Sequence, residues 1–340
     1  DLPGATDAEH EDGISCLQNA LEGYPRERYP VQWAQVQGNL GTAYSQRLSG
    51  TRQDNLELAL AAYQRALEVF TRDAYPREWA KTQSNLGGVF SERLAGDRRE
   101  NQERAIQCHQ QALEIFTRDL FPVEWATTQS KLGRVYGERL AGDLGENQEQ
   151  AINRYTQALD VITRDDYPLQ WASLHVNLGM AYMDRLAGDE SENLEHAIAH
   201  LTYALEIFTA AEFPLPWART HGDLGNVYMD RVAGERRDNV EQAIAHYQRA
   251  LDVFTRTDFP IEWARTQNNL GIAYSRRVMG DPGENLEESI AACKRALEVF
   301  TRDATPLYWA RSQMHLGHAY RNRIQGDRRE NQEQAIAAYA

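Results

Sequence analysis

Arginine and acidic residues recur at one fixed spacing along the chain and could form charged pairs. Arg47 is followed seven residues later by Asp54, and the same spacing recurs at six further arginines, among them Arg231 with Asp238. A carboxylate beside an arginine could act as a catalytic pair in which the carboxylate transfers a proton. Seven copies argue against catalysis, because an enzyme needs only one site. We therefore expect salt bridges that tie the connection between two helices, with Asn55 and its equivalents capping the second helix.

Two histidines at helical spacing could bind a metal ion. His196 and His200 are four residues apart, and His246 is the equivalent of His200 one repeat later. Zinc accepts histidines at this spacing, but no HExxH motif and no third ligand at a fixed position accompany them, so a solvated helix face is the alternative.

Cys293 is expected to be a small core residue. The chain has no glycine-rich phosphate loop, nucleophile elbow or Ser–His–Asp arrangement. The sequence therefore predicts no catalytic residue, no metal site, no cofactor and no enzyme activity.

These residues belong to a repeat of 46 residues. A proline stands three residues before each of the seven tryptophans, a glycine eight after, an arginine fourteen after and an asparagine twenty-two after. Such a period indicates stacked units, because one unit cannot bury its apolar face alone. The tryptophans that mark the repeat are Trp33, Trp79, Trp125, Trp171, Trp217, Trp263 and Trp309.

Each unit predicts two helices and no strand. The first runs from about residue 30 to 48, with Pro30 at its first position and Gly50 beyond its end. The second runs from about 55 to 72, beginning at Asn55, and its apolar residues follow i, i+3, i+4, i+7 spacing. The tryptophans are expected to be buried between neighbouring helices.

The motif residues of each unit resemble the tetratricopeptide repeat. Leu40, Gly41 and Tyr44 match the Leu-Gly-x-x-Tyr of that family's first helix, and the residues from Ala59 to Ala66 match its Ala-x-x-x-aromatic-x-x-Ala. The family's unit has 34 residues, so two insertions of six account for 46. The long form is similar to arrays in large bacterial proteins of caspase-like CHAT proteases. The resemblance implies an all-α, right-handed α-solenoid (superhelix) of stacked antiparallel helix pairs.

The repeats are expected to form a single continuous array over residues 1–340. It would contain a partial repeat at 1–29, six full repeats at 30–305 and a truncated repeat at 306–340. Because both ends fall within a repeat, we expect a section of a larger protein. Open ends of a solenoid expose apolar stacking surface, so head-to-tail self-association is also expected.

The resemblance implies that the first helices line a concave groove in which ligands bind. The groove positions would lie two, five, nine, twelve and thirteen residues after each tryptophan, where the repeats differ most. Methionine adapts to varied apolar groups, and arginine binds carboxylates in a bidentate manner. Unconstrained surface is the alternative explanation of this variation. The predicted partner-binding residues are Arg219, Arg265, Arg311, Met180, Met183, Met229, Ile272, Met314, His318 and Arg321.

Charge and hydropathy narrow the class of partner. The 340 residues include 36 basic and 50 acidic ones, a net charge of −14, which disfavours nucleic acid. No stretch of 18 apolar residues and no signal peptide occur, and three scattered cysteines fit a reducing cytoplasm. The sequence therefore predicts a cytoplasmic scaffold that binds a protein or extended peptide, acidic with apolar side chains, as part of a larger signalling or regulatory protein. The alternatives are the sensor or substrate-docking arm of a CHAT-type cysteine protease, and a structural spacer or self-assembling rod.

Overall fold

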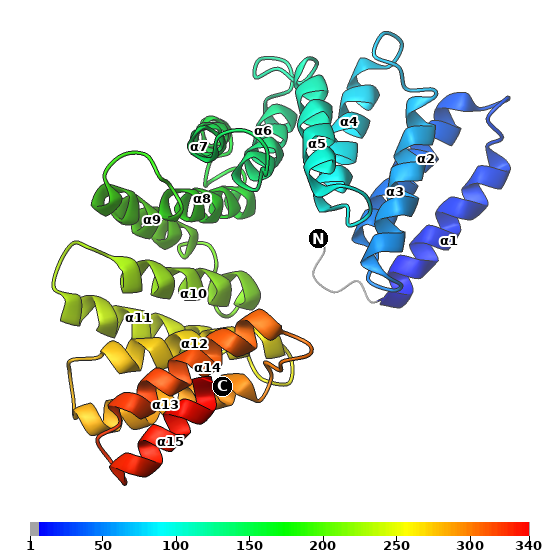
Figure 1. Cartoon of the computed structure of the whole chain (residues 1–340). Helices are drawn as coiled ribbons and strands as arrows, with labels where there is room; N and C mark the ends of the chain where they lie inside the picture. Colours follow the sequence, from blue (N-terminus) through cyan, green and yellow to red (C-terminus); the bar gives the residue numbers. More distant parts are fainter. Residues whose placement is uncertain (1–6, 340) are drawn as a thin grey trace. The chain divides into compact units, whose positions relative to one another are not determined.

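The computed structural model describes residues 7–339, which form fifteen α-helices and no strand (Figure 1). Residues 1–6 and 340, in the partial repeats at the two ends, lie outside the described residues. Contacts divide the chain into two compact units, Asp1–Asp166 and Tyr167–Ala340. The first unit contains α1 (Asp7–Gly23), α2 (Pro30–Gln46), α3 (Arg52–Leu67), α4 (Pro76–Glu92), α5 (Arg98–Leu113), α6 (Pro122–Gly137) and α7 (Leu144–Leu159). The second contains α8 (Pro168–Met183), α9 (Glu190–Ala204), α10 (Pro214–Asp230), α11 (Arg236–Leu251), α12 (Pro260–Arg276), α13 (Pro282–Leu297), α14 (Pro306–Asn322) and α15 (Arg328–Tyr339).

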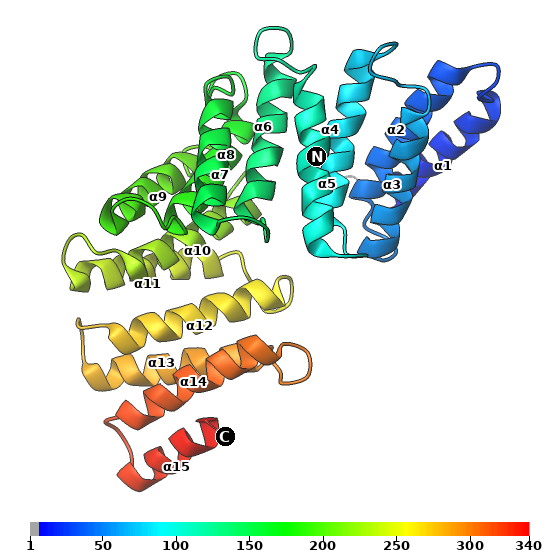
Figure 2. The same cartoon turned by 45° about the horizontal axis from the view of Figure 1, so that its top comes forward.

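Each repeat is a helix pair, as expected, and the pairs stack in order within each unit (Figure 2). The all-α solenoid of stacked antiparallel helix pairs is therefore confirmed. The second helix was placed too late, since α3 begins at Arg52 and ends at Leu67 rather than at 55 and 72. The reason is its cap, because the Thr51 side chain accepts a hydrogen bond from the Asp54 amide. Asp97, Asp143, Asp189 and Asp281 cap the equivalent helices in the same way.

The expected arginine–acid pair within each connection is wrong. Arg231 instead forms a bidentate pair with Glu195 of the preceding repeat, with Nε–Oε1 at 2.6 Å and Nη2–Oε2 at 3.0 Å. Asp238 lies in the first turn of α11 and contacts Arg237. The arginine therefore joins one repeat to the one before it. The other pairs of this kind are Arg47–Glu11, Arg93–Glu57, Arg139–Glu103, Arg277–Glu241 and Arg323–Glu287.

The repeated asparagine is a buried link rather than a helix cap. Asn239 Nδ2 donates to the carbonyl oxygens of Ala233 (2.9 Å) and Arg231 (3.3 Å), and its Oδ1 accepts from Arg231 Nη1 (3.2 Å). Gly234 lies inside this loop with φ +77°, a conformation that favours glycine. One asparagine therefore holds the loop closed and also orients the arginine that binds the preceding repeat.

Replacing Asn239 with alanine should lower the free energy of unfolding by about 1–3 kcal/mol, because two carbonyl groups and a guanidinium lose their partner. Chemical denaturation measures this. The control is Asp238→Asn, which should cost less than about 1 kcal/mol because this exposed carboxylate contributes only a helix-terminal charge and a solvent-exposed ion pair with Arg237. Equal losses of stability in the two variants would contradict this and would instead support the Arg231–Asp238 pair that the sequence suggests.

The tryptophans are not fully buried, so this part of the expectation is wrong. Trp263 is half-buried, whereas Ala264 beside it and Ala296 on α13 are inaccessible to solvent. These two alanines and Phe300 form a core cluster, and the Trp263 ring packs at its edge. Small residues allow the helices to approach closely, which leaves the large indole at the margin. In the first repeat an arginine covers the other face of the ring, with Arg26 5.1 Å from the Trp33 centroid.

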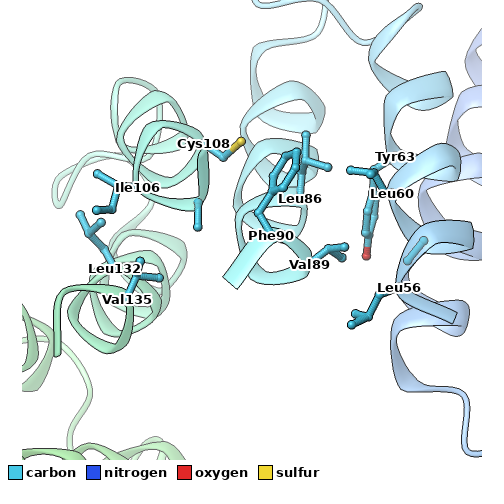
Figure 3. Close-up of a cluster of buried hydrophobic side chains, with 12 residues drawn as sticks. Leu56, Leu60, Tyr63, Leu86, Val89, Phe90, Ile106, Cys108, Leu132 and Val135 are labelled. Carbon is cyan, nitrogen blue, oxygen red and sulfur yellow. The ribbon is translucent and has the colours of Figure 1, made fainter. Parts of the chain in front are cut away.

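The rest of the core connects consecutive helices. In the first unit, Leu86 and Phe90 of α4 lie between Tyr63 of α3 and Cys108 of α5 (Figure 3). Cys293 is buried in the equivalent stack of the second unit, as expected. Of the predicted groove residues, Met229 is part of this core, and Met183 and Ile272 pack against it.

Candidate functional site

The first helices of the second unit form one layer. α8 contacts α10, α10 contacts α12 and α12 contacts α14, whereas α9, α11, α13 and α15, which the structure also describes, do not contact one another. The stack therefore curves toward the first helices in this unit (Figure 2). The predicted groove positions lie on this inner side.

A hollow with a volume of about 510 Å³ lies on these helices. Six of the ten predicted residues line it. The structure therefore brings together the three methionines Met180, Met183 and Met229 (the methionine cluster) and two of the three arginines that lie two residues after a tryptophan (the arginine ladder). The six residues are Met180, Met183, Met229, Arg265, Ile272 and Arg311.

The other four predicted residues do not line the hollow. Arg219 lies 3.8 Å (Nη2–Oε1) from Glu262, so a carboxylate of the chain already faces it. Met314, His318 and Arg321 are exposed elsewhere on α14. Only two of the three arginines of the ladder, Arg265 and Arg311, therefore line the hollow.

The remaining arginines of the hollow have no acidic partner. Arg265, Arg276 and Arg311 form no ion pair with any residue between 7 and 339, although the chain has a large excess of acids. Asp223 lines the same hollow and is half-buried. Burial raises the pKa of the Asp223 carboxyl to about 6, while Arg265 and Arg219 lower it. The hollow thus holds both signs of charge, with Asp223 in the field of Arg265 and Arg219 but in no ion pair with Arg265, Arg276 or Arg311.

Three buried polar atoms at this hollow lack a hydrogen-bond partner among the described residues. They are Asn268 Oδ1, Ser312 Oγ and His315 Nε2. Asn268 is 4% exposed and Ser312 0%. Burial, with a smaller contribution from Arg311, lowers the pKa of His315 to about 4, so this imidazole is neutral at pH 7. Buried polar groups are normally satisfied, so these atoms indicate a bound water or ligand group.

A residue of the second helix explains the unpartnered imidazole. In the first repeat, the Tyr63 hydroxyl of α3 reaches the inner face, where it hydrogen-bonds Thr42 (2.9 Å) and Asn85 of the next repeat. Cys293 takes the place of this tyrosine on α13, and His315 takes the place of Asn85. The thiol of Cys293 is shorter than a tyrosine side chain, so α13 supplies no hydrogen-bond partner for His315.

Sequence reasoning missed one row of polar residues at the site. It lies six residues after each tryptophan, a position that is not among the five groove positions predicted from the sequence. In the second unit this row lines the hollow through Asp223, Asn269 and His315. The sequence feature that could have identified this row is that every residue at this position of the first helices is polar. Its members are Asn39, Asn85, Lys131, Asn177, Asp223, Asn269 and His315.

The histidines form pairs rather than a metal site. His200 Nδ1 lies 2.8 Å from His175 Nδ1, and His246 Nδ1 lies 2.7 Å from His221 Nδ1. No group of three potential metal ligands occurs in the part of the chain that the structure describes. Each histidine pair joins the two helices of one repeat. In the next repeat, Gln267 takes the place of His221 and Ala292 takes the place of His246.

Within residues 7–339, every helix is too short or too polar to cross a membrane. No protein-family model and no curated protein matches the chain. Solved structures do resemble it. The apo form of RapI has a TM-score of 0.56 at 15% identity, covering 90% of this chain and 94% of its own. BtubC (BKLC) from P. vanneervenii has a TM-score of 0.51 at 20% identity, covering 72% and 90%.

A third similar structure is the APC/C hetero-tetramer Cut9–Hcn1, with a TM-score of 0.50 at 17% identity. The match covers 97% of this chain but only 57% of that one. At these identities the likeness concerns the fold alone. It agrees with the stacked helix pairs of this chain, whose fold is an all-α solenoid of helical repeats.

Proposed function

We propose that the hollow of the second unit binds an extended segment of a partner protein, with acidic and apolar side chains. The observation that carries this proposal is the set of arginines without ion pairs, Arg265, Arg276 and Arg311, beside the methionine cluster. The arginines at the ends of the first helices, such as Arg231, Arg277 and Arg323, do pair with carboxylates of the preceding repeat. Because these three guanidinium groups converge on one hollow beside apolar side chains, they are available to bind carboxylates of an external segment.

The chemistry of the lining suits such a segment. Met180, Met183, Met229 and Ile272 would contact apolar side chains, since flexible thioethers adapt to different shapes. The guanidinium groups would bind carboxylates, at about 1.5–3 kcal/mol for each charge-assisted hydrogen bond. These guanidinium groups are the points at which an acidic side chain could bind, because the field of a chain with net charge −14 otherwise repels acidic ligands.

The setting of this scaffold is part of the proposal. The resemblance of the long repeat to arrays of bacterial CHAT-associated proteins supports a cytoplasmic scaffold in a larger signalling or regulatory protein. The hollow would then be the docking site of one continuous array over residues 1–340. In such a protein the array would present the bound segment to a protease domain.

The test is a charge reversal, Arg265→Glu with Arg311→Glu. Twelve-residue peptides are first selected on the wild-type chain from a random display library, and their affinities are measured by fluorescence anisotropy. We expect them to be rich in Asp, Glu and large apolar residues, and to lose at least about a hundredfold in affinity on the double variant, equivalent to about 2.7 kcal/mol.

The matched control is Arg237→Glu with Arg329→Glu, which reverses two exposed arginines at the starts of the second helices α11 and α15. This variant should bind the peptides as the wild type does. Equal affinity of the peptides for the double variant and for this control would place the binding surface elsewhere. Thermal melting of all three proteins should agree within a few degrees, because no lost contact is buried.

A further inference from the structure

The edge of the same hollow carries charges whose arrangement differs between the two units. In the first unit, Arg98 at the start of α5 pairs with Glu138 just after α6, with Nη2–Oε2 at 3.4 Å. Arg52 pairs with Glu92 in the same way one repeat earlier. The first residue of one repeat's second helix thus neutralises the end of the next repeat's first helix.

The second unit has like charges at these positions. Glu190, which begins α9, takes the place of Arg98, and its counterpart is Asp230, the last residue of α10. One repeat later both positions are arginines, Arg236 and Arg276. All four residues line a hollow of about 340 Å³ that shares Met183, Met229, Asp230 and Arg276 with the larger one.

This arrangement is unfavourable for the fold alone. Asp230 stands at a helix C-terminus, where the helix dipole repels a negative charge. Neither Glu190 nor Asp230 forms an ion pair with any described residue, and Arg236 donates to the Met229 carbonyl instead of to a carboxylate. Exchanging Glu190 for arginine would recreate the pairing of the first unit. The chain therefore keeps an acidic junction and a basic junction side by side without neutralising either.

We propose that the segment bound in the hollow is bipolar, with a basic side chain at Glu190 and Asp230 and an acidic side chain at Arg236 and Arg276. This deepens the proposed function and rests on it. The buried unpartnered atoms of Asn268 and Ser312 in the adjoining hollow independently indicate an occupant.

Helix spacing sets the distance between the two charges of the segment. Asp230 and Arg276 lie on the first helices α10 and α12, which contact each other. Packed helices lie about 8–10 Å apart, and an extended chain advances about 3.3 Å per residue. The basic and acidic residues of the segment should therefore be about three positions apart. Leucine-sized side chains near them would contact Met183 and Met229, which line both hollows.

The experiment compares two synthetic twelve-residue peptides on the full chain. The first carries leucines, with a lysine and a glutamate three positions apart, and the second has the lysine replaced by glutamate. Fluorescence anisotropy should show the bipolar peptide binding at least about tenfold tighter. The variant Glu190→Arg should cancel this preference by weakening the bipolar peptide about tenfold, and should raise the melting temperature because the pair with Asp230 is restored.

The outcomes separate this inference from the proposed function. If the all-acidic peptide binds the wild type as tightly as the bipolar one, or Glu190→Arg leaves the preference intact, the bipolar inference is overturned while an acidic partner stands. If neither peptide binds at millimolar concentration, both proposals fail. The control Arg237→Glu, at an exposed position adjacent to Arg236, should leave the preference unchanged.

Discussion

Replacing Phe254 with alanine should lower the free energy of unfolding by about 3–5 kcal/mol. The ring is 1% exposed and packs against Ala218 and Ala250, both inaccessible to solvent. It also meets the Phe259 ring edge-on, with centroids 6.1 Å apart. Because alanine on both neighbouring helices holds the backbones in place, the structure cannot collapse into the cavity. Guanidinium chloride denaturation followed by circular dichroism measures the loss.

The comparison with Trp263→Ala makes this prediction specific to the packing. The indole is larger than the phenyl ring, so sequence reasoning predicts the greater loss there. The structure predicts the smaller loss, since the Trp263 ring is half-buried at the edge of the same cluster and part of it already contacts water. A loss at Trp263 equal to or above that at Phe254 would contradict this placement of the core.

The fold was accessible from the sequence because its signals are local and repeated. A proline marks the first position of α2, at Pro30, and of each equivalent helix, and apolar residues follow it at helical spacing. These signals locate the helices without reference to distant residues. The start of α3 was misplaced because two residues compete as caps. Asn55 has the right chemistry, but its side chain turns into the loop and bonds the carbonyl oxygens of Arg47 and Ser49. Thr51 then caps the helix.

The site was accessible in part, for a similar reason. Variation between repeats located Arg265, Arg311 and the methionines, because groove positions recur at a constant distance from the tryptophan. It could not show that Arg219 faces Glu262, which lies 43 residues later on another helix. Nor could it show that the like charges Glu190 and Asp230, 40 residues apart on α9 and α10, line the same hollow. Only the stacked structure brings such positions together, so the segregation of charge at the groove edge is a structural finding.

Lowering the pH from 7.5 to 5 should destabilise the second unit through its paired histidines. Burial lowers the pKa of His221 to about 4 and that of His246 to about 3. In the unfolded chain both titrate near 6.5. Between pH 6.5 and 4 the unfolded state therefore binds more protons, and stability that is fully present above pH 6.5 is lost as the pH falls. Each histidine that stays neutral at pH 5 accounts for about 2 kcal/mol.

The chain itself supplies the control for this pH dependence. In the next repeat the positions of His221 and His246 hold Gln267 and Ala292, so the double variant His221→Gln with His246→Ala copies a pairing that already folds. Its melting temperature should fall less between pH 7.5 and 5 than that of the wild type. Asp223 acts in the opposite direction, because its raised pKa of about 6 favours the folded state at low pH. Equal slopes for wild type and variant would mean that the buried imidazoles take up protons without opening the helix pair.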